Sequence, residues 1–379
     1  MSDGPTLTDR STLTYRRVAL WGAVLAKLVG AWGLGWDIQW HMTIGRDSFW
    51  IAPHLMIYGS VVVGLALGWG VLAYEWWYGV PSTRGFRLAA LGLVLVVLAA
   101  PIDDLWHRLF GLDVTLWSPP HLLALFGSAV STLGCLLIAI EVCPPGSWAG
   151  RAALLIAGAL LYGGIRVTLE PSWLFAYTYG GVLFHTFAML AALILPLALV
   201  TAARLSGSRW APVVAVILSV AVGISGQQVA RAGFAILQPV SYIGEEIAKD
   251  SSSHIAVGRE IAEKNQAVPP PSWALRLALP LVPAAVMALA DPRRRPGAAA
   301  IAYGVAVFAV YAWFLSTLPA YAPLAPPVLE TVTALALTIA LGAAGGTAAR
   351  WLADRLIGGA TGTRGARGRA VAGATSPGR

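Results

Sequence analysis

Aspartate and histidine gather in a stretch near the start of the sequence, WDIQWHMTIGRDSFWIAPH, residues 36–54. Asp37 and His41 are four residues apart, so in a helix their side chains share one face. His54 follows a proline at the start of the next apolar run, where proline fits the first turn of a helix. One carboxylate and two imidazoles between two helix ends form a donor set for a single metal ion with open coordination positions.

The same pattern recurs in DDLWHRLFGLDVTLWSPPH, residues 103–121, with one extra residue before its second tryptophan. Both copies read Asp-x-x-Trp-His, five residues, Asp, a Trp and then Pro-His, and together they hold four of the six histidines. The second donor set is Asp103, His107 and His121. Asp104 is an alternative to Asp103, because only the register of the repeat separates them. The repeat predicts duplicated helical hairpins.

Several neighbouring residues are expected to support the two donor sets. The later aspartate of each copy would orient a histidine or pair with a nearby arginine. The tryptophan before each first histidine would wall a dry pocket or pass electrons, with plain packing as the alternative. His185, further along the chain, would approach one of the donor sets as a fourth ligand or a proton relay, or would simply pack in the core. These residues are Trp40, Arg46, Asp47, Trp106, Arg108, Asp113 and His185.

The two sets also admit a purely structural interpretation, in which aspartate and histidine cap helix ends and bond to each other. Ionisable groups near the bilayer are costly, however, and are rarely kept without a role. Two matched sets of metal-ligand types therefore favour metal binding.

Membrane-spanning helices must position these residues. Of the 379 residues 57% are hydrophobic and 12% are charged, whereas soluble domains carry about 25% charged residues. Apolar runs of about 20 residues predict an all-α, polytopic membrane protein with about ten transmembrane helices. The two cysteines fall within one expected helix, so no disulfide is expected. The expected spans lie near residues 18–36, 52–76, 86–105, 120–142, 150–168, 181–203, 211–230, 273–290, 298–316 and 327–349.

Arginines in alternate loops predict the orientation of these spans. By the positive-inside rule, both termini lie in the cytoplasm, the chain crosses the inner (plasma) membrane, and both donor sets lie at the outer face. The long outer loop would form an interfacial helix or a lid, and the basic tail would attract anionic headgroups rather than nucleic acid. The regions are a cytoplasmic N-terminus (1–17), duplicated metal-site hairpins (18–142), transmembrane helices (143–230), an outer amphipathic loop (231–272), further transmembrane helices (273–354) and a disordered basic tail (355–379).

The first stretch follows the motif Asp-x-x-Trp-His-Met-Thr-x-x-Arg-Asp-Ser/Thr followed by Pro-x-His or a close variant. Its matching residues are Asp37, Trp40, His41, Met42, Thr43, Arg46, Asp47, Ser48 and His54. Here the chain resembles the C subunit of particulate methane monooxygenase and of ammonia monooxygenase. The resemblance covers residues 36–126 and implies copper at Asp37, His41 and His54. It implies a second metal position at Asp103, His107 and His121, where the family has Asn in place of Asp103.

Two departures limit the resemblance: the proline stands one place away from its position in Pro-x-His, and residues 150–379 are not explained by it. The resemblance implies a copper-dependent subunit that oxidises a small apolar substrate with O2, with a quinol as electron source and with partner subunits. Two other hypotheses stay open. Two histidines and one carboxylate suit a non-haem iron oxygenase. Alternatively, the outer sites would serve a copper or zinc handling or transport protein that is not an enzyme.

Overall fold

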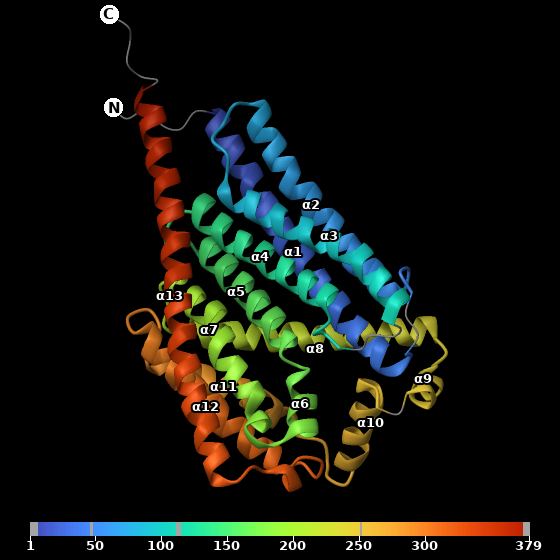
Figure 1. Ribbon diagram of the computed structural model, residues 1–379. Helices are drawn as coiled ribbons and strands as arrows, with labels where there is room; N and C mark the ends of the chain where they lie inside the picture. The colour runs from blue at the N-terminus through green and yellow to red at the C-terminus, as the bar shows by residue number, and fades with distance from the viewer. Residues whose placement is uncertain (1–6, 46–47, 111–114, 251, 374–379) are drawn as a thin grey trace, which may run out of the picture.

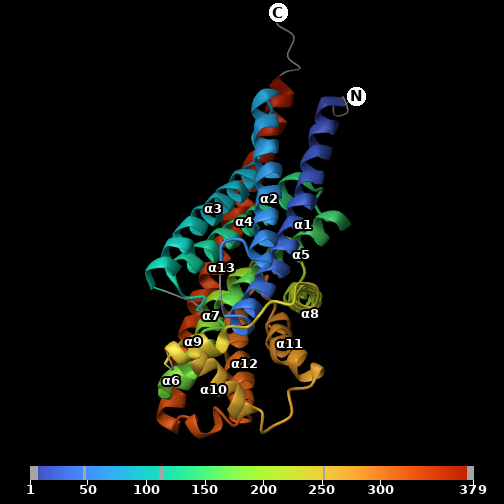
Figure 2. The same ribbon diagram turned by 90° about the vertical axis from the view of Figure 1, so that its right-hand side faces the viewer.

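The structure, a computed structural model, describes residues 7–45, 48–110, 115–250 and 252–373, and these residues form an all-α fold (Figures 1 and 2). The long helices are α1 (Leu7–Thr43), α2 (Ala52–Trp77), α3 (Arg84–Phe110), α4 (Pro119–Val142), α5 (Trp148–Thr168), α7 (Thr186–Ser206), α8 (Ala211–Leu237), α11 (Trp273–Leu289), α12 (Pro296–Ser316) and α13 (Val328–Gly373). Shorter elements are α6 (Ser172–Tyr179), α9 (Ile243–Lys249), α10 (His254–Asn265), η1 (Gly181–His185) and η2 (Ala322–Leu324).

The chain is a polytopic membrane protein. Nine helical segments of the described chain are long and apolar enough to cross a membrane, and α11 is a shorter apolar helix of 17 residues. At 1.5 Å per residue α11 spans about 26 Å, slightly less than the hydrocarbon core of a bilayer. Each expected span coincides with one of these ten helices, and the duplicated hairpins are α1–α2 and α3–α4.

Helices extend beyond the expected membrane spans at both ends of the chain. Helix α1 begins at Leu7, so residues 7–17 of the predicted cytoplasmic N-terminus are helical. Helix α13 continues to Gly373, although residues 355–379 were predicted to be disordered. Residues 355–373 include six glycines, which disfavour a helix interior, so intrinsic helix propensity does not explain this extension.

Four glycines let the backbones of α3 and α4 approach closely. Gly85 and Gly92 on α3 and Gly127 and Gly134 on α4 are each seven residues apart, which keeps them on one seam. A Cβ atom at Gly92 would lie 2.5 Å from the Gly127 carbonyl oxygen, and one at Gly85 would lie 2.5 Å from the Ile138 nitrogen. Small residues allow this packing in membranes. The second donor set therefore lies at the end of a tightly packed helix pair.

We expect Gly92→Ala to destabilise the protein by about 1–3 kcal/mol, because the added methyl group overpacks the seam against backbone atoms. Gly59 of α2 is the matched control, since a Cβ atom there has open space around it. Gly59→Ala should be neutral or stabilising by up to about 1 kcal/mol. Unfolding in detergent measures the stability of both variants. Equal stability of the two would contradict the close packing of α3 on α4 at Gly92.

Two buried glutamates accept hydrogen bonds at the start of α3. The Thr83 backbone N–H donates to Glu75 Oε2 over 2.9 Å, and the Gly85 N–H donates to Glu141 Oε2 over 3.0 Å. Arg16 Nε donates to Glu75 Oε1 at 2.9 Å, and this ion pair is buried. These carboxylates satisfy helix N-terminal N–H groups and interact favourably with the helix dipole. They fix the ends of the hairpins opposite the donor sets.

Helix α8 lies across the bundle: it runs crosswise to α13 in Figure 1 and is seen end-on in Figure 2. It packs against α1, α5 and α11. The segment after it is attached to the end of α1, because Ser241 Oγ donates to the Thr43 carbonyl at 2.6 Å and the Tyr242 N–H donates to the Ile44 carbonyl at 2.7 Å. The second half of the chain therefore contacts the first hairpin close to its donor set.

The predicted outer loop contains the short helices α9 and α10. Ile243 and Ile255 are buried, so these helices turn apolar residues towards the protein. Helix α10 is joined to α6, since the Tyr177 hydroxyl donates to Glu260 at 2.8 Å and Lys264 Nζ donates to the same hydroxyl at 2.6 Å. The hydrogen bond from Lys264, with a smaller contribution from Tyr177, lowers the pKa of Glu260. Contact of this region with a bilayer surface stays a prediction.

Candidate metal centre

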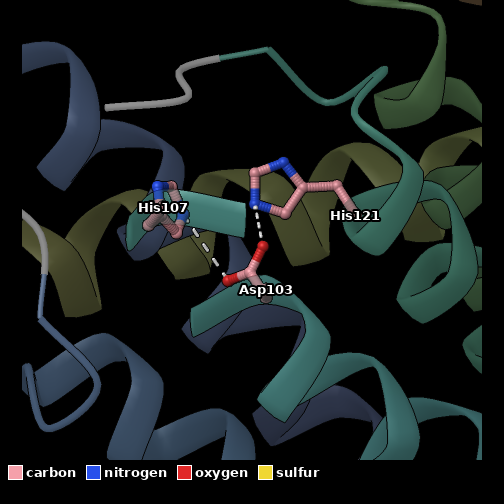
Figure 3. A group of neighbouring side chains, drawn as sticks. All are labelled: Asp103, His107 and His121. Atoms are coloured by element: carbon pink, nitrogen blue, oxygen red, sulfur yellow. Dashed lines mark ion pairs between the residues drawn. The ribbon is translucent and has the colours of Figure 1, made fainter. Parts of the chain in front are cut away.

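Asp103, His107 and His121 meet where α3 ends and α4 begins. Asp103 and His107 are one helical turn apart near the end of α3, and His121 lies in the first turn of α4, which begins with two prolines. His107 Nε2 is 3.6 Å from Asp103 Oδ2, and His121 Nε2 is 3.2 Å from Asp103 Oδ1. Figure 3 shows the two imidazoles on either side of the carboxylate. One ligand atom from each residue lies within 4.8 Å of the other two, as a shared metal ion requires.

The hydrogen bonding of His121 determines which of its nitrogens can bind a metal. His121 Nδ1 lies 2.8 Å from the Thr115 carbonyl oxygen. A carbonyl only accepts, so Nδ1 carries the proton, and in the neutral ring Nε2 presents its lone pair towards Asp103. In a metal-bound histidine, the ring nitrogen that does not bind the metal usually donates its N–H to a backbone carbonyl, a carboxylate or water.

The carboxylate of Asp103 provides a second test of whether an ion fits. Its Oδ1 atom is buried and makes no hydrogen bond within the described part of the chain, although His121 Nε2 is only 3.2 Å away. The side chains are about one-fifth exposed, so solvent compensates this charge only in part. A cation between the carboxylate oxygen and the nitrogen lone pair would compensate both groups, as would a second proton on the imidazole. The donor set therefore fits a metal ion.

The structure distinguishes Asp103 from Asp104. Asp104 Oδ2 pairs with Arg108 Nη2 at 2.7 Å, whereas the carboxylate that lies within reach of both histidines is that of Asp103. The register of the repeat thus predicted the aspartate that faces His107 and His121. Asp113, which the sequence suggested as a partner of Arg108, lies outside the described residues.

Asp37, His41 and His54 are also brought together, at the end of α1 and the start of α2. Asp37 Oδ1 is 3.1 Å from His54 Nε2 and 3.6 Å from His41 Nδ1. The centres of the two imidazole rings are 6.4 Å apart, against 6.1 Å in the second set. The first set is the more buried of the two.

The two sets differ in how the first histidine is turned. His41 Nδ1 lies 2.9 Å from the backbone carbonyl of Asp37, so this nitrogen carries the proton. The Asp37 carboxylate thus lies nearer the protonated nitrogen of His41, whereas His107 turns Nε2 towards Asp103. In the second set, therefore, the Nε2 atoms of both histidines already face the carboxylate, as metal coordination requires. Arg46 and Asp47 lie outside the described residues, so their proposed support of the first set stays a prediction.

The tryptophans before the histidines are not equivalent. Trp40 is buried and stacks on Phe234 of α8, with ring centres 5.8 Å apart. Trp106 instead packs on Phe110 of its own helix at 4.4 Å. Among the described residues, the ring contact of Trp40 thus joins two helices, whereas that of Trp106 stays within α3.

His185 lies in the core of the second half of the chain. Its ring stacks on Phe308 of α12 at 4.3 Å and meets Phe184 edge-on at 5.2 Å. These contacts agree with the core-histidine alternative, and among the described residues none joins His185 to either donor set.

Sequence reasoning gave no role to the turn before α4. The Trp117 indole N–H donates to the Thr168 carbonyl at 2.6 Å, and the Trp117 backbone N–H donates to Thr115 Oγ1 at 3.2 Å. Trp117 belongs to the repeat, and that position in the sequence could have identified it as a residue of the site. Its partner is 51 residues away, and no local pattern identifies it.

The fold and the two clusters define a class: a polytopic α-helical membrane protein with an Asp-His-His cluster in each of two repeated hairpins. The chain matches no protein-family model, no curated protein and no solved structure. The resemblance to the monooxygenase C subunit therefore rests on motif residues alone.

Proposed function

We propose that this protein is a membrane-embedded copper protein that oxidises a small apolar molecule with O2. Asp103, His107 and His121 hold one metal ion, and Asp37, His41 and His54 hold another. The single observation that carries the proposal is the approach of His121 Nε2 to the Asp103 carboxylate at 3.2 Å, with Nδ1 bonded to a carbonyl. Copper, O2 and a possible quinol donor and partner subunits come from the resemblance.

The roles of the protein's own residues follow from their positions. Asp103 supplies the negative charge that attracts the cation, and the two imidazoles supply neutral nitrogen ligands. The Thr115 carbonyl holds His121 in one tautomer. A bound copper ion supplies the one-electron chemistry that O2 activation needs. Three protein ligands leave coordination positions open for small molecules.

The apolar surroundings support an apolar substrate. Leu105, Leu109 and Leu122 are exposed on α3 and α4 beside the second set. In a membrane these side chains face lipid, so an apolar molecule dissolved in the bilayer has direct access to this end of the hairpin.

Non-haem iron is a second candidate, favoured by the donor set itself. Two histidines and one carboxylate with open positions are the ligands of non-haem Fe(II) oxygenases. The residues and their roles are the same in this alternative, and only metal identity separates the two.

We propose further that both termini face the cytoplasm of a plasma membrane, with the donor sets on the outer side. The first turns of α1 and the last turns of α13 lie at one end of the molecule (Figure 1), and the helix ends that carry the donor sets lie at the other end of α1–α4. The loops on the termini side carry most of the arginines, as the positive-inside rule requires.

Metal analysis of the purified protein tests the function. We expect copper in the wild type, with a Cu(II) electron paramagnetic resonance (EPR) signal split by imidazole nitrogens. His121→Ala should remove the signal of the second set and His54→Ala that of the first. His254→Ala is the matched control, because His254 is an exposed histidine at the start of α10, and it should retain all the metal.

The other outcomes are equally informative. Iron in place of copper would support the non-haem alternative. Zinc alone would exclude redox chemistry and favour metal handling. A protein that binds none of these ions, even when they are added after purification, would contradict the proposal.

A further inference from the structure

The turn at residues 115–118 links the second donor set to α5 and α6, the helices that follow α4. This turn joins the undescribed segment after α3 to the first turn of α4. Within this turn, the Thr115 carbonyl accepts the hydrogen bond from His121, and the Trp117 side chain bonds to another helix.

Three hydrogen bonds connect His121 to the end of α5. His121 Nδ1–H donates to the Thr115 carbonyl at 2.8 Å. The Trp117 backbone N–H donates to the hydroxyl of the same threonine at 3.2 Å, and the Trp117 indole N–H donates to the Thr168 carbonyl at 2.6 Å. Thr168 is the last residue of α5, where helix carbonyls lack helical partners.

The indole ring of Trp117 is also held by packing. It contacts Phe175 of α6 with ring centres 4.9 Å apart. Trp50, its counterpart in the first copy of the repeat, is 70% exposed and packs on Phe49 and Tyr58, which are near it in the sequence. The repeat therefore placed a tryptophan in each hairpin. Among the described residues, Trp117 is bonded to α5 and packed on α6, whereas the ring contacts of Trp50 stay within its own hairpin.

We propose that Trp117 is a positioning residue for the metal ligand His121. It fixes the turn that carries the Thr115 carbonyl, and that carbonyl fixes the tautomer and the rotation of the imidazole, so that Nε2 is directed towards Asp103. The inference rests on the proposed function, since it assumes a metal ion at the second set. It also gives the helices after α4 a role that the family resemblance did not supply.

The test uses Trp117→Phe in the full-length protein, in a His54→Ala background so that the second set dominates metal binding. Phenylalanine keeps ring packing on Phe175 and removes the indole N–H. We expect Cu(II), titrated against a competing chelator, to bind about 10-fold more weakly than in the His54→Ala parent. The Cu(II) EPR spectrum should change from one species to a mixture, because His121 is no longer held in one orientation.

Two further variants separate positioning from general damage. Thr115→Val removes the hydroxyl that accepts the Trp117 backbone N–H and should reproduce the mixed EPR spectrum. Trp50→Phe, the control from the first hairpin, should leave the affinity and spectrum of the second set unchanged. If Trp117→Phe binds Cu(II) with the same affinity as the parent and shows a single EPR species, the positioning role of Trp117 is overturned while the proposed function stands. Failure of the parent itself to bind Cu(II) would overturn the proposed function and this inference together.

Discussion

The Asp103→Leu variant should lose metal binding at the second set while its metal-free form stays as stable as the wild type. Removing a direct ligand should weaken affinity by more than about 100-fold, the upper end of the effect of losing an outer partner. The metal-free protein should not suffer, because Asp103 Oδ1 makes no hydrogen bond within the described residues and its charge is only partly solvated. An apolar residue of similar size removes that cost.

This result distinguishes a metal site from a structural ion pair. If Asp103 and His121 merely bonded to each other, Asp103→Leu would destabilise the metal-free protein by about 1.5–3 kcal/mol. Unfolding of chelator-treated protein in detergent, beside a metal titration, separates the two cases. Asp104→Leu is the matched control, because Asp104 is the neighbouring carboxylate and pairs with Arg108. It should retain metal affinity, and loss of metal in both variants would contradict the assignment of Asp103 as ligand.

Glu75→Ala should have the largest effect on stability, a loss of about 3–5 kcal/mol. The substitution leaves the buried Arg16 guanidinium without its carboxylate and removes the acceptor of the Thr83 backbone N–H. An unpaired buried charge costs far more than the pair contributes, which is why the loss is large. Detergent unfolding followed by circular dichroism measures it.

An exposed ion pair provides the comparison for Glu75. Glu263 pairs with Arg259 within α10, and both side chains are more than half exposed. Glu263→Ala should leave the unfolding transition almost unchanged, because exposed pairs of this kind contribute little. The double variant Arg16→Met, Glu75→Leu should recover much of the stability that Glu75→Ala loses, since it removes both charges together. A Glu75→Ala protein as stable as Glu263→Ala would show that the buried pair is not needed.

The donor sets were predictable because their information is local. Asp37 with His41 and Asp103 with His107 are one helical turn apart, and each partner histidine follows a proline that starts the next helix. Helical periodicity alone brings such residues together at a hairpin turn. The register of the repeat favoured Asp103 and left Asp104 as an alternative, and the structure brings Asp103 beside both histidines. The orientation of the imidazole rings was not predictable, because it depends on which carbonyl each ring nitrogen meets.

The features that sequence reasoning missed join residues far apart in the chain. Trp117 meets Thr168, Arg16 meets Glu75 and Trp40 meets Phe234 only after the helices have packed. His185 was placed in the core by Phe308, 123 residues further on, and not beside a donor set. The extension of α13 to Gly373 was also missed. The basic, glycine-rich composition of residues 355–373 suggested disorder, and no local preference in that composition accounts for the helix.

The sequence by itself determined the membrane-spanning fold, the number and approximate limits of its long helices, and the residue types in each Asp-His-His cluster. Apolar run length and helical periodicity are properties of neighbouring residues, so they act before any tertiary contact forms. The tertiary structure alone decided that α8 lies across the bundle, that α3 and α4 pack through glycines, and that the second cluster is the better arranged for a metal ion. Those outcomes depend on which distant surfaces fit together, and packing complementarity of that kind is not written in any local stretch of sequence.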